Sequence, residues 1–188
     1  MYPDTDYDVI VVGGGPAGST VGALLADAGR KVLVIDLEKF PRFRVGESLM
    51  PATYWTLERL GVLDQMKCSS FPNKHSVQFF AKNGEAAAPY YFSRVNQHES
   101  SQTWQVDRRD FDHMLLKNAA AKNADVFEQV RVHEVLFDGD RAIGIRAEFK
   151  NGVKKAVTAK VIVDATGQSA IISKKLKLRR TDPNLKHC

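Results

Sequence analysis

The chain has 188 residues, of which 44% are hydrophobic and 26% are charged, a composition typical of a soluble globular protein. That length allows one domain with a sizeable core, or one domain and part of a second. No apolar run approaches the roughly 20 residues of a membrane span, and Asp4, Asp6 and Asp8 occupy the start, where a secretory signal would be basic. The net charge of +5 is scattered except at residues 174–180, and no nucleic-acid-reading motif accompanies it, which argues against a nucleic-acid partner.

Cysteine usage indicates a reducing compartment. Cys68 and Cys188 form no C-x-x-C pair and no cluster with metal-ligand spacing. We therefore expect a cytoplasmic protein that has neither a structural disulfide nor a metal ion.

The first 36 residues predict a βαβ unit. Residues 7–12 form an apolar run rich in β-branched side chains, which predicts a buried parallel strand. A glycine-rich turn follows, then a helix that continues to Ala28, with Gly29 in the position of a C-cap glycine. Residues 31–35 predict a second buried strand, which ends at Asp36. The apolar face of the helix carries Val21, Leu24, Leu25 and Ala28.

The middle of the chain predicts a loop, a short helix and a hairpin. Prolines punctuate residues 40–51, which are expected to form the loop. A helix should follow at residues 52–60, where a glycine stops it. Residues 77–82 and 85–92 flank an Asn-Gly dipeptide, which is typical of a tight hairpin turn.

The last part predicts a helix, an antiparallel region and a return to the parallel sheet. The helix is expected over residues 110–122. Residues 126–158 show short alternating runs broken by two turn dipeptides, which predicts an antiparallel meander. Residues 161–164 predict one more buried strand, so the order is that of an interrupted α/β fold. The inner face of the helix carries Phe111, Met114, Leu115 and Ala119.

The glycine-rich turn has the spacing of a dinucleotide site. Gly13 allows a tight turn, Gly15 lets a diphosphate approach the backbone, and Gly18 lets the helix pack close to the strand. The helix N-terminus offers N–H groups to the phosphates, while Asp36 can bind ribose hydroxyls and would repel the 2′-phosphate of NADP. The alternative is an ordinary turn followed by a surface aspartate. The predicted fold is therefore a Rossmann-like FAD/NAD(P)-binding domain with an inserted antiparallel β region. The predicted cofactor contacts are Gly13, Gly15, Pro16, Ala17, Gly18 and Asp36.

Residues 8–18, D-V-I-V-V-G-G-G-P-A-G, resemble the N-terminus of the FAD-dependent monooxygenase and halogenase superfamily. The resemblance implies FAD as the cofactor, which spacing alone does not separate from NAD. The sequence departs from the family at Asp36, a position where the family often has glutamate.

Residues 40–51, F-P-R-F-R-V-G-E-S-L-M-P, resemble the F-P-R-x-x-x-G-E-S-x-x-P stretch of flavin-dependent halogenases, a loop that wraps the cofactor in that family. The resemblance implies that Arg44 neutralises diphosphate charge and that Gly46 permits close backbone approach. Glu47 and Ser48 would hydrogen-bond the flavin side. The alternative is a proline-bounded surface loop in which the serine serves as a helix cap.

Residues 105–112 resemble the R-x-x-F-D segment of the family, whose arginine reaches FAD from the start of a helix. The register maps that arginine onto Arg108 rather than Arg109. The alternative is a helix N-terminus at which Asp110 and Asp112 interact favourably with the helix dipole. This role is compatible with a cofactor contact from Arg108.

Residues 164–169, D-A-T-G-Q-S, resemble a strand end that returns to the dinucleotide site in the family. The resemblance implies cofactor contacts at Asp164 and Gly167. The alternative is that Asp164 simply caps a turn.

Residues 71–79 resemble the segment around the catalytic lysine of flavin-dependent halogenases, which maps onto Lys74. In that family, FAD reduced by a partner reacts with O₂ to give a hydroperoxide, and halide attack then makes hypohalous acid. The lysine hydrogen-bonds the hypohalous acid or forms a chloramine with it, and hands the halogen to an electron-rich aromatic ring. The alternative is one more solvated lysine among the 27 Lys and Arg residues.

The chain lacks the W-x-W-x-I-P segment of halogenases and the second flavin motif, both of which would lie beyond Cys188. We therefore expect residues 1–188 to be the N-terminal FAD-binding portion of a longer halogenase. Its implied partners are a small aromatic substrate and halide, with a separate flavin reductase as one source of reduced FAD. The alternatives are a flavin monooxygenase or reductase of the same superfamily, or an inactive nucleotide-binding fragment. An NAD-dependent dehydrogenase is disfavoured, because the β region interrupts the fold and no hydride-transfer site is visible.

Overall fold

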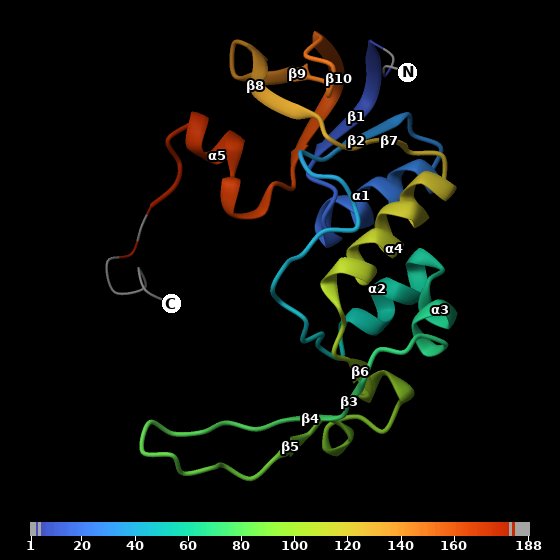
Figure 1. Cartoon of the computed structure of the whole chain (residues 1–188), viewed down its shortest axis with the longest axis vertical. Coiled ribbons are helices and arrows are strands. Elements are labelled where there is room, and N and C mark those ends of the chain that lie inside the picture. The colour runs from blue at the N-terminus through green and yellow to red at the C-terminus, as the bar shows by residue number, and fades with distance from the viewer. Residues whose placement is uncertain (1–2, 4, 181, 183–188) are drawn as a thin grey trace. The chain divides into compact units, whose positions relative to one another are not determined.

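The computed structural model describes residues 3, 5–180 and 182, and the chain divides into two compact units. The first unit joins Met1–Phe40 to Met114–Cys188, and the second unit is Pro41–His113. Figure 1 labels the helices and strands. Among the described residues, no helix has both the length and the apolar character needed to cross a bilayer. Cys68 is a free, exposed thiol, and Cys188 lies outside the described residues.

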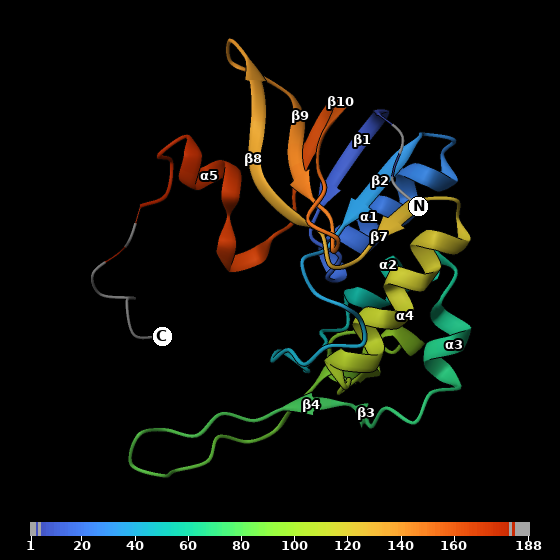
Figure 2. The ribbon, with the colours of Figure 1, turned by 45° about the horizontal axis from the view of Figure 1, so that its top comes forward.

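The first unit is built on one six-stranded sheet (Figure 2). The strand order is β7 (Asp125–Phe127), β2 (Val32–Ile35), β1 (Asp6–Val12), β10 (Lys154–Asp164), β9 (Arg141–Glu148) and β8 (Arg131–Asp138). The first four strands pair in parallel, and β10, β9 and β8 pair antiparallel. This arrangement confirms the predicted α/β class with a parallel core and an added antiparallel region. It also corrects the predicted meander, because β7 pairs in parallel with β2 instead of beginning the antiparallel run.

Strand β10 belongs to both parts of the sheet. Its first half pairs antiparallel with β9, and its second half pairs in parallel with β1, where Asp164 lies opposite Val12. The predicted return to the parallel sheet is therefore confirmed. The predicted burial of this strand end is wrong, because Val161 is 51% exposed. Successive side chains of a strand point to opposite faces, and it is the neighbouring Ile162 that packs against the core.

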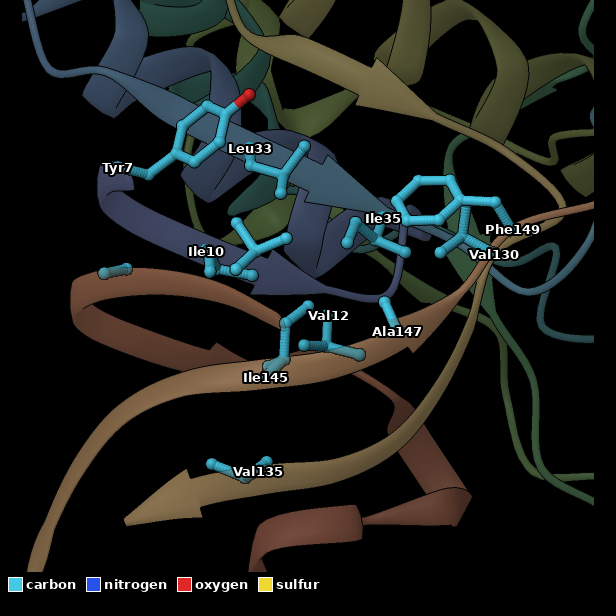
Figure 3. Close-up of a cluster of buried hydrophobic side chains, with 12 residues drawn as sticks. Tyr7, Ile10, Val12, Leu33, Ile35, Val130, Val135, Ile145, Ala147 and Phe149 are labelled. Carbon is cyan, nitrogen blue, oxygen red and sulfur yellow. The ribbon is translucent and has the colours of Figure 1, made fainter. Parts of the chain in front are cut away.

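Buried side chains from these strands form the core of the first unit (Figure 3). Burial of each large aliphatic or aromatic side chain contributes roughly 1.5–3 kcal/mol to the free energy of unfolding. Because the cluster draws side chains from parallel and antiparallel strands alike, this burial holds them in one sheet. The cluster consists of Tyr7, Ile10, Val12, Leu33, Ile35, Val130, Val135, Ile145, Ala147, Phe149, Val157 and Ala159.

Helix α1 (Pro16–Asp27) packs through its smallest residues. The buried positions are Gly18, Ser19, Gly22 and Ala23. The predicted apolar face is therefore wrong, since three of its members are only half-buried and Ala28 is exposed. A Cβ on Gly22 would lie 2.6 Å from Cγ2 of Val34, so glycine is what permits this close approach to the sheet. The predicted C-cap is confirmed, because Gly29 has φ +75° and the next amide donates to a carbonyl in the last turn.

The second unit contains two short helices and two short ladders. Helices α2 (Thr53–Leu60) and α3 (Leu63–Lys67) lie next to each other in sequence, and α2 ends at Gly61, as predicted. The ladders pair β3 (Asn73–Lys74) with β6 (Thr103–Trp104), and β4 (Ser76–Val77) with β5 (Tyr90–Tyr91). Two 3₁₀ turns follow β5, Phe92–Arg94 and Glu99–Ser101.

Three further helical segments are present among the described residues. Helix α4 (Arg108–Ala121) contributes residues to both units, and Phe111, Leu115 and Ala119 of its predicted inner face are buried. In the first unit, a 3₁₀ turn (Gly167–Ser169) and helix α5 (Ile171–Lys175) follow β10.

The predicted hairpin of the second unit forms, but with less strand than predicted. Beyond the β4–β5 ladder, its described pairing consists of one bridge between Phe80 and Ala86 and isolated backbone hydrogen bonds. Phe79 and Phe80 are 69% and 68% exposed, so few side chains support the pairing. A two-stranded hairpin without a packed face is only marginally stable, which accounts for the short strands.

Candidate functional site

The glycine turn of the first unit is shaped by its own backbone. Gly13 has φ +109°, and a Cβ at this position would collide with the carbonyl oxygen of Ala165. A Cβ on Gly18 would collide with the carbonyl oxygen of Gly13. Both glycines therefore let the turn, the start of α1 and the end of β10 lie against one another.

The N-terminus of α1 is suited to an anion. Gly15 is its N-cap with no side-chain cap, Pro16 follows, and the first turn carries no acidic residue. The amide of Ser19 makes the first helical hydrogen bond, to the carbonyl of Gly15 at 2.9 Å. The amides of Ala17 and Gly18 precede it and belong to the donors that helices leave for a ligand. This uncapped end fits the diphosphate of a dinucleotide.

Asp36 is tied to the same turn. Its Oδ2 accepts a hydrogen bond from the amide of Gly14 at 2.7 Å, and its Oδ1 accepts one from Glu38 at 2.8 Å. Each carboxylate oxygen has a second lone pair, so these bonds orient the group and leave acceptor capacity for ribose hydroxyls. The structure thus brings the predicted acid and the predicted turn together at the carboxyl ends of β1 and β2.

Asp164 caps the turn that follows β10. Its Oδ1 accepts bonds from the amide and hydroxyl of Thr166, at 3.2 and 2.6 Å, and its Oδ2 accepts one from the amide of Ile172 at 2.8 Å. Gly167 has φ +61°. The turn-capping alternative therefore describes Asp164 in this structure, and a cofactor contact at Asp164 or Gly167 stays a prediction.

The loop at residues 41–51 of the second unit gathers the predicted Arg44, Gly46, Glu47 and Ser48. Arg44 is exposed and donates to the carbonyl of Phe43 at 3.1 Å. Glu47 accepts a bond from the amide of Gly46, which has φ +115°. The loop is held through its backbone, because Ser48 bridges Gln105 next to β6.

Arg108 binds this loop and a buried acid. Its Nη1 donates to the carbonyl of Val45 at 3.0 Å, while its Nε and Nη2 donate to the two oxygens of Asp112 at 2.7 and 3.0 Å. A Cβ on Gly46 would lie 3.0 Å from the guanidinium, so glycine gives the arginine its space.

Asp112 is the residue that sequence reasoning misjudged. The expectation was an acid near the helix dipole, but its side chain is fully buried and also accepts a 3.0 Å bond from Arg42. Two arginines share one buried carboxylate, which leaves the trio with net positive charge. The spacing of Arg108 and Asp112, four residues apart on one helix, is the signal that could have revealed the pair.

Lys74 lies among uncharged groups. Its Nζ donates to Oγ of Ser48 at 2.6 Å and to the carbonyl of Leu49 at 3.0 Å, and lies 3.9 Å from Sδ of Met50. The Nζ also lies over the ring of Phe92, 5.4 Å from its centroid. Burial without a compensating carboxylate lowers the pKa of the Lys74 ammonium from its usual value. A lysine of this kind has more free amine near neutral pH than an exposed one, which suits it to react with an electrophile.

A mostly apolar pocket of about 450 Å³ lies within the second unit. It shares Met50 and Phe92 with the surroundings of Lys74. The arrangement therefore offers an amine whose pKa is lowered by burial next to a space that can take a small ring.

Comparisons with known proteins agree with these features. Residues 6–186 match the family described as FAD binding domain. The 1H-pyrrole-2-carbonyl-[peptidyl-carrier protein] chlorinase of Pseudomonas fluorescens is 34% identical, over 96% of this chain and 43% of that protein. The solved myxobacterial chondrochloren halogenase CndH is 41% identical with a TM-score of 0.81, over 86% and 37% of the two chains. The flavin-dependent halogenase CmlS is 31% identical with a TM-score of 0.85, over 96% and 33%. This chain thus spans less than half the length of these relatives.

Proposed function

This chain belongs to the FAD binding domain family, and from that premise we propose that it is the FAD-binding portion of a longer flavin-dependent halogenase. The family and the FAD cofactor predicted from the sequence motifs are thereby confirmed. The proposal of halogenation onto an electron-rich aromatic ring rests on one observation, the uncharged surroundings of Lys74.

We assign the ADP half of FAD to the first unit. The amides of Ala17 and Gly18 would bind the diphosphate, Gly15 would let it approach, and Asp36 would bind the ribose. Pro16 fixes the first helical residue without adding an amide that needs a partner. In the second unit, the positive charge of Arg44 and Arg108 and the polar groups of Gly46, Glu47 and Ser48 would serve the rest of the cofactor. Contacts from Asp164 and Gly167 are part of the same proposal.

Bound FAD supplies the oxidising chemistry that turns halide into hypohalous acid. Lys74 then acts on that acid. As an ammonium, Nζ donates a hydrogen bond to its oxygen; as a free amine, Nζ gains the halogen while a proton and hydroxide leave as water. Ser48 and Leu49 hold the nitrogen in place for either route. The lowered pKa favours the second route.

The test uses the enzyme that contains this chain, supplied with chemically reduced FAD, O₂ and bromide. Lys74→Ala should lower the yield of halogenated aromatic product by about a hundredfold or more, since removal of a covalent catalyst usually costs at least this much. The FAD dissociation constant should stay within about twofold, because Lys74 is not among the proposed FAD contacts. Undiminished halogenation in the Lys74→Ala enzyme would exclude the proposed role.

A second candidate function is a flavin monooxygenase or reductase that needs no lysine. One observation favours it: the solved flavoprotein/dehydrogenase of Cytophaga hutchinsonii is 35% identical to this chain, with a TM-score of 0.84 over 94% of it. The same Lys74→Ala enzyme separates the two functions, because a hydroxylase or reductase would keep its turnover. A separate flavin reductase as the electron source is part of the halogenase proposal alone.

A further inference from the structure

Thr103 of strand β6 is a buried polar residue to which the proposed function assigns no role. It is 1% exposed, and its Oγ1 makes no hydrogen bond to any group among the described residues. A buried hydroxyl without a partner is unfavourable, and valine, which has the same shape, would avoid that cost. The hydroxyl therefore points to a partner that comes within reach when a neighbouring side chain moves.

Strand β6 lies between strand β3 and the loop at residues 41–51, all within the second unit. On the β3 side, the amide of Gln105 donates to the carbonyl of Pro72 at 2.9 Å. On the loop side, the carbonyl of Trp104 accepts a hydrogen bond from the amide of Leu49 at 3.1 Å. Successive residues of β6 thus bond to opposite neighbours, so a side chain that runs from β3 to the loop has to cross β6.

The side chain that crosses is Lys74, and it does so on the face from which Thr103 projects. Lys74 lies directly opposite Thr103 in the antiparallel β3–β6 ladder, and Ser48 lies opposite Gln105. Directly opposite residues of an antiparallel pair project to the same face, as do residues two apart in one strand. The hydrogen bond from Lys74 to Ser48 therefore spans β6 on the Thr103 face.

The Lys74 ammonium has a donor that its strong acceptors do not use. Of its three N–H groups, two suffice for the bonds to Oγ of Ser48 and to the carbonyl of Leu49. Its further described contact is 3.9 Å to Sδ of Met50, and a thioether is a weak acceptor. Opposed Cα atoms lie about 4.5–5.5 Å apart in an antiparallel pair, a distance that the flexible lysine stem can span. Nζ can therefore reach the hydroxyl of Thr103.

The proposed halogen transfer calls for a second position of the nitrogen. A free amine has two N–H groups, which suffice for Ser48 and Leu49. When Nζ forms its bond to the halogen, the halogen–oxygen bond of hypohalous acid breaks, and the hydroxide leaves as water with one proton of the amine. One N–H group is left, so the nitrogen no longer bonds both acceptors. A hydroxyl donates as well as accepts, so Thr103 can bond this nitrogen through its N–H group or its lone pair.

We propose that the Thr103 hydroxyl is a second hydrogen-bonding position for the Lys74 nitrogen, which Nζ occupies when it leaves Ser48 and Leu49. Thr103 is then a positioning residue, because it acts on the reaction through Lys74 and holds neither substrate nor cofactor. The inference rests on the proposed function, in which Lys74 carries the halogen.

The first experiment follows Lys74 itself in the 188-residue protein, without halogenation. At a fixed pH below the midpoint of its titration, an amine reagent labels a lysine in proportion to its free-amine fraction. Ser48→Ala and Thr103→Val should each raise the labelling rate of Lys74 by about threefold or less, because one acceptor for the ammonium remains. The double variant should label at least about threefold faster than the product of the single effects, since it has lost both. Purely multiplicative effects would overturn the proposal. The exposed Lys82 serves as the internal reference.

Two substitutions of Thr103 separate hydrogen bonding from packing. Thr103→Val keeps the shape and removes the hydroxyl, whereas Thr103→Ser keeps the hydroxyl and removes a methyl group. In the Ser48→Ala background, the valine change should raise the labelling rate of Lys74 by about threefold or more, and the serine change should leave it within about twofold. The reverse order would mean that Thr103 acts on Lys74 by packing alone, which would overturn the proposal.

The stability of Thr103→Val in the otherwise wild-type chain tests the premise. The urea midpoint should stay the same or rise, because the hydroxyl has no described partner to lose when Nζ bonds Ser48. A clearly lower midpoint, or a chain that fails to fold, would show that the hydroxyl serves the fold and would overturn the proposal.

The second experiment measures halogenation by the longer enzyme that contains this chain, supplied with chemically reduced FAD, O₂ and bromide. Thr103→Val should lower the rate by about threefold to tenfold, as expected for a less well-positioned reacting group, and Thr103→Ser should keep the wild-type rate. An unchanged rate in Thr103→Val would overturn the positioning role. An undiminished rate in Lys74→Ala would instead refute the proposed function, and the labelling results would still decide whether Thr103 bonds the lysine.

Discussion

The ammonium of Lys74 donates a 2.6 Å hydrogen bond to Oγ of Ser48, which lies 26 residues earlier in the sequence. This bond connects the predicted catalytic segment to the predicted cofactor loop. Ser48 belongs to the loop that resembles a cofactor-wrapping segment, and Lys74 belongs to strand β3. The hydroxyl predicted to face flavin therefore accepts a bond from the proposed halogen carrier. Through this bond, Ser48 of the cofactor loop can fix the position of the Lys74 Nζ.

Ser48→Ala tests this positioning role. Loss of the acceptor removes a bond that favours the charged form, so the pKa of Lys74 should fall further. Because the free amine gains the halogen in the favoured route, the acid limb of the pH–rate profile, where the rate rises as Lys74 loses its proton, should move to lower pH. The halogenation rate should fall by about tenfold, as expected for a mispositioned reacting group. Ser48→Thr keeps the hydroxyl, so its pH–rate profile and its halogenation rate should both match those of the wild-type enzyme. A profile that does not move would show that Ser48 has no influence on the lysine.

The direction of the Lys74 pKa gives a second prediction. Because burial holds this pKa below 10.5, the free-amine fraction of Lys74 rises at lower pH than in a model lysine. Pulse labelling with an amine reagent, followed by peptide mass spectrometry, should give a rate-against-pH curve for Lys74 whose midpoint lies below 10.5. A midpoint at or above that value would contradict the direction of the shift.

Asp112→Asn should be the most destabilising of the acidic-to-amide changes in the second unit. It leaves Arg42 and Arg108 buried beside a neutral group, and breaking a buried ion pair in this way costs about 3–5 kcal/mol of unfolding free energy. Asp110→Asn is the matched control on the same helix, because its side chain is 58% exposed and the change should cost less than about 0.5 kcal/mol. Urea unfolding measures both. Similar midpoints for the two variants would mean that the buried trio contributes no stability.

Asp36→Asn should weaken FAD binding while leaving the fold intact. The amide oxygen can replace only one of the two carboxylate oxygens that accept bonds from Gly14 and Glu38, and the side chain loses the charge that strengthens bonds from ribose hydroxyls. We expect the dissociation constant for FAD to rise about tenfold to a hundredfold, the equivalent of one charge-assisted hydrogen bond. Quenching of flavin fluorescence reports the affinity, and an unchanged value would remove Asp36 from the ribose site.

The parts of the structure that local chemistry determines were predictable from the sequence. The strand, the turn and Asp36 lie within one βαβ unit, where glycine spacing and strand ends follow from short-range rules. The caps at Gly29 and Gly61 belong to the same class, because a left-handed residue at a helix end depends on its neighbours alone.

The remaining features depend on packing between distant segments. The buried face of α1 follows from how closely Gly22 approaches Val34, which hydrophobic periodicity does not encode. The burial of Asp112 requires Arg42, which lies 70 residues away in sequence. The exposure of Val161 likewise depends on what covers each face of the finished sheet.

The central claim is that the uncapped start of α1 binds the diphosphate of FAD. Gly15 has φ −69° and ψ −175°, an extended conformation that any residue adopts, so Gly15→Val adds bulk next to the diphosphate without backbone strain. Calorimetric titration of FAD into the folded wild-type chain should give saturable binding, and the folded Gly15→Val chain should bind at least about tenfold more weakly. No detectable heat of binding from the wild-type protein, or the same affinity in both proteins, would contradict the claim.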